Sequence, residues 1–410
     1  MAMGGILQGA QFSPTGELIV VPGDQVSDAF QRQRVSIPFN LLDNSLVFNA
    51  APQIMDTALT GGGTFTYLTG ESAGRLRVGL ANGDRVIRQS FARPPYQPGR
   101  SYLILMTGIM GAIKAGVAQR IGAFDADNGL FFEQNGTTLR VVVRRAGVDV
   151  AVDQANWNLD KMDGTGPSGV TINMAAAQVF VIDFQWLGVG RVRYGFSIAG
   201  KTVYCHEVLN ANVSTVGVYM VTSSNPVRYE IQNLDVSPSN TDLIEICASI
   251  VSEGGQEPLG LLGSCSSFLA NTTGLNLVAL TRTPVATIRL KSGFEKAAFR
   301  LLALDALNES ADFIFVEVFA GGVLSGGAAV VTAVSEALEM VTGNTTLTGG
   351  DRLYSTHLSS QLREATDSLL STAFFGSTIA GVPQIVTVTM TAMNGASTGA
   401  HAGLTWREYP

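Results

Sequence analysis

The sequence predicts an all-β protein with two tandem antiparallel β-sandwich domains of the jelly-roll kind, preceded by an extended N-terminal arm. Short runs of β-branched and aromatic residues recur along the chain, and Gly, Pro and Asn-Gly turns separate them. Several runs alternate apolar and polar residues, as half-buried strands do. The length of 410 residues exceeds the size at which a single hydrophobic core usually stops growing, so two domains are expected.

The domain limits follow from changes in composition. Residues 1–45 combine three prolines with the short apolar run Leu18–Val21, which is typical of an extended arm. The segment Glu253–Pro258 contains two glycines and a proline and is the best candidate for a linker. We therefore expect the first β-sandwich domain over residues 46–253 and the second over residues 254–410.

Tight turns organise the first domain. Asn-Gly and Ala-Gly pairs supply the positive φ angles that two-residue hairpins need. We expect such turns at Asn82-Gly83, Asn135-Gly136, Ala146-Gly147 and Ala199-Gly200. The first of these turns is expected to join Arg75–Leu80 to Arg85–Ser90 as a hairpin, because both flanking runs have strand character.

The second domain also contains short runs of β-branched and aromatic residues that predict strands. Runs with strand character are Ala286–Leu290, Phe299–Leu304, Phe313–Phe319 and Gln384–Thr391. Helix signals are sparse, and only Val334–Met340 and Ser359–Leu370 are expected to form short helices. No heptad repeat predicts a coiled coil.

Charge and composition exclude several classes of partner. The chain has 26 Lys and Arg against 33 Asp and Glu, a formal net charge of −7, and no basic stripe with interleaved aromatics, so no nucleic-acid partner is expected. Only 14% of residues are charged, which favours a surface partly covered in an assembly. The apolar segments 102–118 and 318–334 fall short of the roughly 20 apolar residues that a membrane-spanning helix needs. The first residues lack the pattern of a secretory signal, so export by that route is not expected.

One segment formally matches a phosphate-binding loop. Gly195–Thr202 satisfies the expression G-x-x-x-x-G-K-[ST], and the apolar run ending at Asp183 resembles a metal-binding strand. A phosphate loop must lead into a helix, whereas Thr202–Val208 has strand character. A hairpin turning at Ala199-Gly200 explains the segment better, so no nucleotide cofactor is expected.

Metal sites are not expected either. The segments Asp125–Gly129 and Asn158–Gly164 contain the oxygen-rich residues of calcium loops, but their spacing is wrong and neither has the bidentate Glu. Turn residues that bind their own backbone are the favoured interpretation, with a structural calcium ion as the alternative. Cys205, Cys247 and Cys265 match no zinc-binding spacing and are expected to be buried thiols.

No set of residues predicts catalysis, and no catalytic residue is assigned. Hydrolysis of a glycosidic bond needs two carboxylates across a cleft, and the candidate pairs are Asp183 with Glu207 and Asp125 with Glu133. His206, His357 and His401 lie in no nucleophile motif, and His206 is expected to be a structural histidine. The tryptophans could stack on sugars, but such residues more often fill a core or an interface; they are Trp157, Trp186 and Trp406.

Eight blocks of sequence, all beyond about Arg85, form a distinctive set. They are Arg120–Asp125, Asn128–Phe132, Trp157–Asp160, Asp163–Gly169, Asp183–Arg193, Cys247–Gly255, Ile288–Leu290 and Leu404–Glu408. In these blocks the chain resembles a group of virion structural proteins of large tailed phages and related aquatic viruses. The N-terminal arm lies outside the resemblance, and the group has no catalytic signature that could be transferred residue by residue.

The resemblance implies a non-enzymatic component of a phage particle, located in the virion as a tail, tail-fibre or capsid-surface protein. It also implies a homo-oligomer in contact with other virion proteins, and the fibre-like character of the group favours a trimer. Two alternatives stay open. The chain could be a carbohydrate-binding module that recognises a host-surface glycan, because β-sandwiches commonly present loops to glycans, or it could be a glycan hydrolase.

Overall fold

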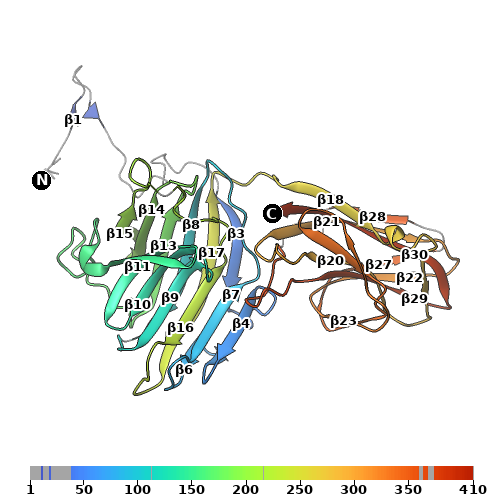
Figure 1. The fold of residues 1–410 in the computed structure, drawn as a ribbon, viewed down its shortest axis with the longest axis horizontal. Helices are drawn as coiled ribbons and strands as arrows, with labels where there is room; N and C mark the ends of the chain where they lie inside the picture. The colour runs from blue at the N-terminus through green and yellow to red at the C-terminus, as the bar shows by residue number, and fades with distance from the viewer. Residues whose placement is uncertain are drawn as a thin grey trace, which may run out of the picture.

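The computed structural model describes residues 11–12, 18–19, 38–111, 113–215, 217–359, 363–367 and 374–409. Within these ranges every regular element is a β-strand, apart from the 3-10 turns η2 (Gln154–Asn156) and η3 (Ser267–Leu269). All strand pairs within the sheets are antiparallel, and the sheets pack as two sandwiches that lie end to end (Figure 1). The predicted all-β fold class with two antiparallel sandwiches is confirmed.

The first sandwich consists of two large sheets. The seven-stranded sheet has the order β12 (Val148–Asp153), β11 (Thr138–Arg145), β10 (Gly129–Asn135), β9 (Val117–Phe124), β16 (Val227–Asn233), β7 (Arg85–Ser90) and β4 (Met55–Thr60). The eight-stranded sheet has the order β15 (Lys201–Val208), β14 (Val192–Ile198), β13 (Gln178–Phe184), β8 (Ser101–Ile109), β17 (Thr241–Glu253), β6 (Ala73–Val78) and β5 (Thr64–Leu68), with β3 (Phe39–Ser45) also paired to β17.

The second sandwich is smaller. Its five-stranded sheet has the order β18 (Leu261–Ser266), β30 (Ser397–Tyr409), β21 (Ala298–Asn308) and β28 (Arg363–Asp367), with β19 (Leu275–Leu277) also paired to β30. Its six-stranded sheet has the order β24 (Val330–Ala333), β25 (Leu338–Thr342), β20 (Thr283–Leu290), β29 (Val386–Ala392), β22 (Ile314–Ala320) and β27 (Asp351–Leu358). Two small pairs complete the fold: β1 (Gln11–Phe12) with β2 (Leu18–Ile19), and β23 (Val323–Ser325) with β26 (Thr346–Thr348).

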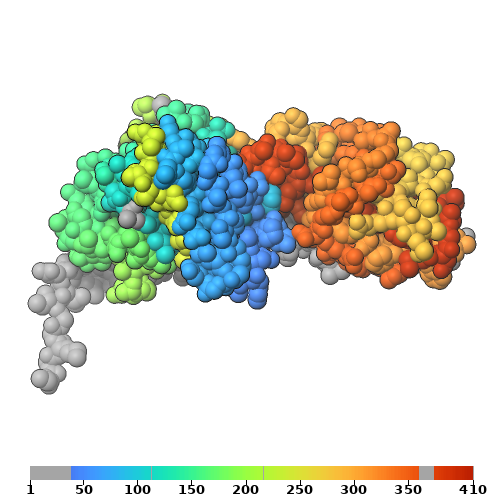
Figure 2. All heavy atoms as spheres, turned by 90° about the horizontal axis from the view of Figure 1, so that it is seen from below, coloured from blue at the N-terminus to red at the C-terminus, as the bar shows by residue number. Residues whose placement is uncertain are grey.

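Each sandwich encloses its own hydrophobic core. In the first, Phe132 of β10 packs against Phe180 and Phe196 of the opposite sheet, with ring centroids 5.2 and 4.9 Å away. The second core contains the fully buried Trp406 and Phe299. The space-filling view shows the two bodies in contact along an elongated molecule (Figure 2).

The expected hairpin at Asn82-Gly83 is wrong. β6 lies in the eight-stranded sheet and β7 lies in the seven-stranded sheet, so the turn crosses from one layer of the sandwich to the other. Gly83 N–H donates to Asn233 O, and Asn233 N–H donates to Asp84 O. These bonds connect the turn to β16, and β6 and β7 do not pair with each other. The crossing brings Val78 and Val86 into one core, where both are fully buried.

The N-terminal arm was expected to reach residue 45, but its last part belongs to a sheet. Phe39–Ser45 forms β3, which pairs with β17 over the register Cys247↔Ser45 to Ser252↔Phe39. Leu41 and Leu42 are buried, and their contribution to the first core explains why this segment joins the sandwich.

Two helix predictions do not agree with the described residues. The segment 334–340 leads into β25, because Leu338 and Met340 alternate toward the second core and pair with β20 and β24. Arg363–Asp367 forms β28, and the rest of the predicted helix up to Leu370 lies largely outside the described residues. No helix in the described part of the chain has the length and apolar character that a membrane span requires.

Candidate functional site

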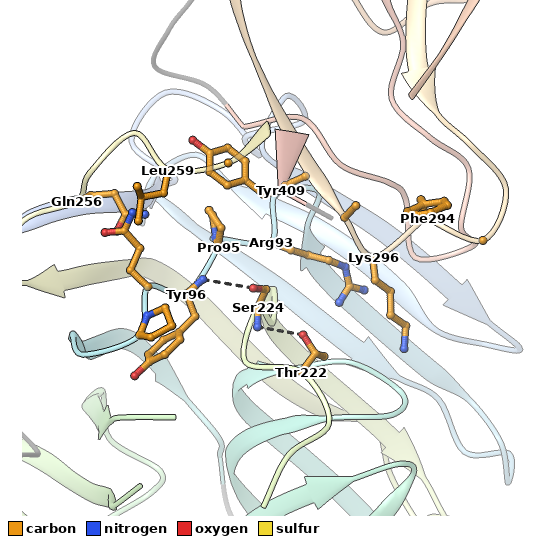
Figure 3. A pocket seen from close by; sticks show the side chains of 16 residues that line it. Arg93, Pro95, Tyr96, Thr222, Ser224, Gln256, Leu259, Phe294, Lys296 and Tyr409 are labelled. Atoms are coloured by element: carbon orange, nitrogen blue, oxygen red, sulfur yellow. Dashed lines mark hydrogen bonds between the residues drawn. The ribbon is translucent and has the colours of Figure 1, made fainter. Parts of the chain in front are cut away.

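A pocket of about 410 Å³ lies where the two sandwiches meet, and we call it the junction pocket (Figure 3). Its volume falls in the range of small-molecule binding sites. Both sandwiches supply its walls, including Arg93, Thr222 and Ser224 from the first and Phe294, Lys296 and Tyr409 from the second. The site therefore depends on how the two bodies are held together.

The connection between the sandwiches is fixed by hydrogen bonds beside the pocket. Gln97 Nε2 donates to Glu257 O at 2.5 Å, and Glu257 N–H donates to Gln97 Oε1 at 3.0 Å. Arg100 adds an ion pair of 3.2 Å to the Glu257 carboxylate, and Tyr102 OH contacts Gln256 Oε1 at 3.3 Å. The segment expected to be a linker is thus clamped against the first sandwich.

Asp125 holds two cations at the pocket wall. Arg93 Nη1 donates to Asp125 Oδ2 at 2.8 Å, and Lys296 Nζ lies 3.5 Å from the same oxygen and also pairs with Asp127. Asp125 Oδ1 accepts the backbone N–H groups of Asp127 and Asn128, each at 2.8 Å. Burial raises the pKa of Asp125, but Arg93 and these N–H groups outweigh burial, so the pKa lies below its usual value. The carboxylate is therefore ionised at neutral pH.

Arg93 is a buried cation whose donors are mostly unused. Its exposed fraction is 7%, and among the described residues its one hydrogen-bonded partner is Asp125. A guanidinium has five N–H donors, so four remain for groups that enter the pocket. Burying a charged group with unfilled donors costs free energy, which acceptor atoms of a ligand or of water would recover.

Neutral groups complete the pocket. The hydroxyl oxygens of Ser224 and Thr222 accept the backbone N–H groups of Tyr96 and Ser224, at 3.3 and 3.2 Å (Figure 3). In these bonds each hydroxyl acts as acceptor, so its own proton is available to donate. The half-buried ring of Tyr409, at the end of β30, forms an aromatic part of the wall. The pocket thus offers hydrogen-bond donors beside an aromatic ring.

The carboxylates considered for hydrolysis are all engaged with arginines. In the strand register Arg193 lies between Asp183 and Glu207, so a cation separates the first pair. The second pair is separated along β9 and β10, with Asp125 in the turn and Glu133 within β10. The ion pairs are Asp183 with Arg193, Glu207 with Arg191, Asp125 with Arg93 and Glu133 with Arg120. Neither pair forms two free carboxylates across a cleft.

The histidines have structural contacts. His206 is buried, and its Nδ1 accepts the backbone N–H of Asn158 at 3.2 Å. Burial lowers its pKa, which favours the neutral ring. The expectation of a structural His206 is confirmed. The other two rings pack on phenylalanines, His357 on Phe315 and His401 on Phe268.

The tryptophans do not line the junction pocket. Trp157 and Trp406 are buried in the two cores, so neither can stack on a sugar. Trp186 is half-buried, and its Nε1 donates to Met220 O at 3.0 Å. The expectation that these residues fill cores is confirmed for Trp157 and Trp406.

The segment that matched a phosphate loop is a hairpin. β14 ends at Ile198 and β15 begins at Lys201, and Ala199 and Gly200 have φ angles of 50° and 77°. A strand follows the turn, so no helix N-terminus is present to bind phosphate. The predicted hairpin is confirmed.

The two segments that resembled calcium loops are turns bound by their own carboxylates. Asp125 binds backbone N–H groups as described above, and Asp160 accepts those of Met162 and Ser168 at 2.8 and 2.7 Å. The turn interpretation is confirmed. In the described ranges no group of three or more His, Cys, Asp or Glu is arranged to hold a metal ion.

The cysteines are free thiols with different burial. Cys205 and Cys265 are buried, as expected. Cys247 is only partly buried, so the expectation is wrong there. The register of β17 against β8 shifts between Glu245 and Cys247, and this irregularity interrupts the alternation of buried and exposed positions.

Sequence reasoning missed the junction pocket. Arg93, Lys296 and Tyr409 are separated by up to 316 positions, and no local pattern connects them. The one sequence signal nearby is the irregular segment with Pro94-Pro95 and Pro98-Gly99, which indicates a loop but not its partner.

A second cavity opens at one end of the first sandwich, between the edge strands β12 and β15. It has a volume of about 580 Å³, and we call it the valine groove. Val148 and Val150 of β12 are 66% and 63% exposed there, although valines at such alternating positions usually face a core. Its apolar walls include Val141, Val143, Val148, Val150, Val152 and Leu209.

Comparison with known proteins gives weak likenesses. No family model and no curated protein sequence matches the chain. A protein of unknown function from Shewanella oneidensis MR-1 has a TM-score of 0.34 at 8% identity, covering 55% of this chain and 91% of that one. A legume lectin-like domain from Entamoeba histolytica has a TM-score of 0.32 at 11% identity, with coverages of 53% and 98%. A glycosyl hydrolase family 16 protein from Mycobacterium smegmatis has a TM-score of 0.32 at 11% identity, with coverages of 52% and 100%. Likenesses at this level carry no inference about function.

Proposed function

We propose that this chain is a non-enzymatic carbohydrate-binding protein and that the junction pocket is its binding site. The observation behind this proposal is the combination of an aromatic ring with unused hydrogen-bond donors in one pocket of suitable size. A sugar presents an apolar ring face and several hydroxyl acceptors, and the two features fit the ring of Tyr409 and the donors of Arg93, Ser224 and Thr222.

The state of the carboxylates supports a non-enzymatic role. Glycoside hydrolysis needs one carboxyl group that is protonated near neutral pH. No carboxylate lines the pocket among the described residues, and the nearby Asp125 lies behind Arg93 and Lys296. Asp125 has a lowered pKa, and each of its oxygens already has two donors or cations close by. It is therefore suited to hold Arg93 in place and unsuited to donate a proton to a leaving group.

A glycan array tests the binding proposal. Wild-type protein is expected to bind a subset of glycans, and Tyr409→Ala is expected to lower that binding at least tenfold, because the variant loses the ring wall of the pocket. Trp186→Phe is the matched control, since its ring lies outside the pocket. The absence of binding by wild-type protein across a broad array of neutral and acidic glycans would sink the proposal.

A second candidate function is a structural component of a virus particle, and the two functions are compatible in one molecule. The eight blocks of sequence that carry the resemblance support it, and several of their residues hold the fold together. Asp125 and Asp160 accept backbone N–H groups of their own turns. Asp183 and Arg193 form a buried ion pair. The valine groove adds independent support. An apolar cavity left open in the isolated chain is expected to be covered in an assembly.

Quantitative mass spectrometry of purified particles tests the second candidate. Hundreds of copies in proportion to the coat protein would identify a capsid subunit or surface decoration. A few tens of copies or fewer, in multiples of three or six, would identify a tail or fibre protein. Absence from the particle contradicts this candidate and leaves the carbohydrate-binding proposal untouched.

A further inference from the structure

We infer that the junction pocket selects acidic saccharides, those with a carboxylate on the sugar ring such as uronic acid units, and that Arg93 determines this selectivity. The inference rests on the proposed carbohydrate binding and specifies its ligand class. It follows from the charge, burial and unused donors of the groups at one wall of the pocket.

The guanidinium of Arg93 matches a planar carboxylate. Its Nη1 is held by Asp125, which fixes the plane of the group, and its other N–H donors have no partner among the described residues. A carboxylate can accept two parallel hydrogen bonds from such a fork, in bidentate geometry. A neutral sugar hydroxyl accepts fewer and weaker bonds, because bonds between ionised groups are roughly twice as strong.

Lys296 adds a second cation on the same side. Its Nζ approaches the oxygen of Asp125 that Arg93 binds, so the two cations converge at one point of the wall (Figure 3). The negative charges of Asp125 and Asp127 repel a ligand carboxylate. However, both oxygens of Asp125 are already engaged by N–H groups and cations, and Asp127 has 53% of its side chain exposed to solvent, which screens its charge. The unused donors of Arg93 therefore dominate the contact with a ligand.

Isothermal titration calorimetry can test the selectivity with defined probes. Trimers of galacturonate, glucuronate and mannuronate, and the methyl ester of each, differ in the carboxylate charge but keep the ring. At least one acid is expected to bind tenfold or more tightly than its ester. Arg93→Gln is expected to remove this difference, and Lys296→Gln is expected to reduce it severalfold.

Controls separate loss of selectivity from loss of folding. Arg77→Gln removes a more exposed Arg–Asp ion pair, with Asp242, on a strand outside the pocket, and it is expected to keep the preference for the acid. Circular dichroism melting checks each variant. If Arg93→Gln does not fold, Lys296→Gln decides, because Lys296 is about half exposed and its loss must weaken the acid without weakening the ester.

The outcomes distinguish the two proposals. Equal binding of acid and ester by wild-type protein, or a preference that survives in both variants, overturns the inference about acidic saccharides and leaves carbohydrate binding intact. No binding of any trimer or ester, together with a blank glycan array, overturns carbohydrate binding itself.

Discussion

Glu230 lies within a row of ion-paired arginines and glutamates on the outer face of the seven-stranded sheet. Arg120 bridges Glu230 and Glu133 through bonds of 2.6 and 2.7 Å, and Arg85 binds Glu230 at 2.9 Å. Burial raises the pKa of Glu230, but the guanidinium groups of Arg228, Arg120 and Arg85 lower it to about 2. We call this row the arginine–glutamate ladder; it consists of Arg140, Glu133, Arg120, Glu230, Arg85 and Arg228.

Glu230→Gln is expected to lower the free energy of unfolding at pH 7 by roughly 3 kcal/mol, because it leaves buried guanidinium groups without their anion. The folded-state pKa of Glu230 lies below the ordinary value of 4.5, so its contribution is present above pH 4.5 and is lost as the pH falls toward 2. The difference between wild type and variant should therefore shrink from pH 5 to pH 2. Urea unfolding at a series of pH values measures it.

Asp242→Asn provides the comparison for this prediction. Its carboxylate binds Arg77 at 2.6 Å, but both side chains are about one-third exposed, so solvent screens the pair. Such an exposed pair contributes much less to stability than a buried one, so Asp242→Asn is expected to change the free energy of unfolding far less than Glu230→Gln. An equal loss of stability in both variants, or a Glu230→Gln effect that does not depend on pH, would contradict the role given to the ladder.

At the scale of elements, the backbone conformation of two turn residues determines the β14–β15 hairpin. Ala199 has a φ of 50°, in the left-handed region that a residue with a Cβ enters at a cost, and Gly200 follows with a φ of 77°. Asn tolerates this region better than Ala, and Asn-Gly is the preferred pair in such turns. The native turn is therefore not at its stability optimum.

Ala199→Asn is expected to raise the free energy of unfolding by about 0.5–1 kcal/mol, since it relieves this strain. Gly200→Ala is expected to lower it by about 1 kcal/mol, although a Cβ at Gly200 would meet no atom within 4 Å. Chemical denaturation measures both changes. Opposite signs for the two variants support a turn governed by φ, whereas two destabilising changes would show that side-chain contacts govern it.

At the scale of the whole molecule, the valine groove leaves part of the first core open. β12 and β15 are the edge strands of their sheets, so the groove lies between two edges that a second chain could extend. The resemblance to virion structural proteins implies a homo-oligomer, and a second copy of this chain is the partner we expect at the groove. The trimer stays a prediction from the resemblance.

Val150→Lys is expected to shift the protein toward the monomer, because it places a charge in the apolar contact. Light scattering coupled to size-exclusion chromatography measures the mass. Val236→Lys is the matched control, because Val236 is 71% exposed and does not line the groove. The groove is not the assembly surface if wild type is an oligomer and Val150→Lys has the same mass. The same conclusion follows if wild type is monomeric at all concentrations tested.

The sequence alone determined the class of fold and most of the tight turns. Alternation in strands such as β29 and positive-φ pairs such as Ala199-Gly200 act over a few residues, so their effect can be worked out locally. For the same reason the sequence predicts that the carboxylates of Asp125 and Asp160 accept backbone N–H groups of their own turns, as the structure shows.

Only the tertiary structure decided which strands pair and where a ligand can bind. Asn82-Gly83 has the local form of a hairpin turn, but the gain from burying Val78 and Val86 in one core places β6 and β7 in different sheets. Arg93, Lys296 and Tyr409 meet because two separately packed bodies come into contact. Such contacts depend on the shape and burial of whole surfaces, which no short stretch of sequence encodes.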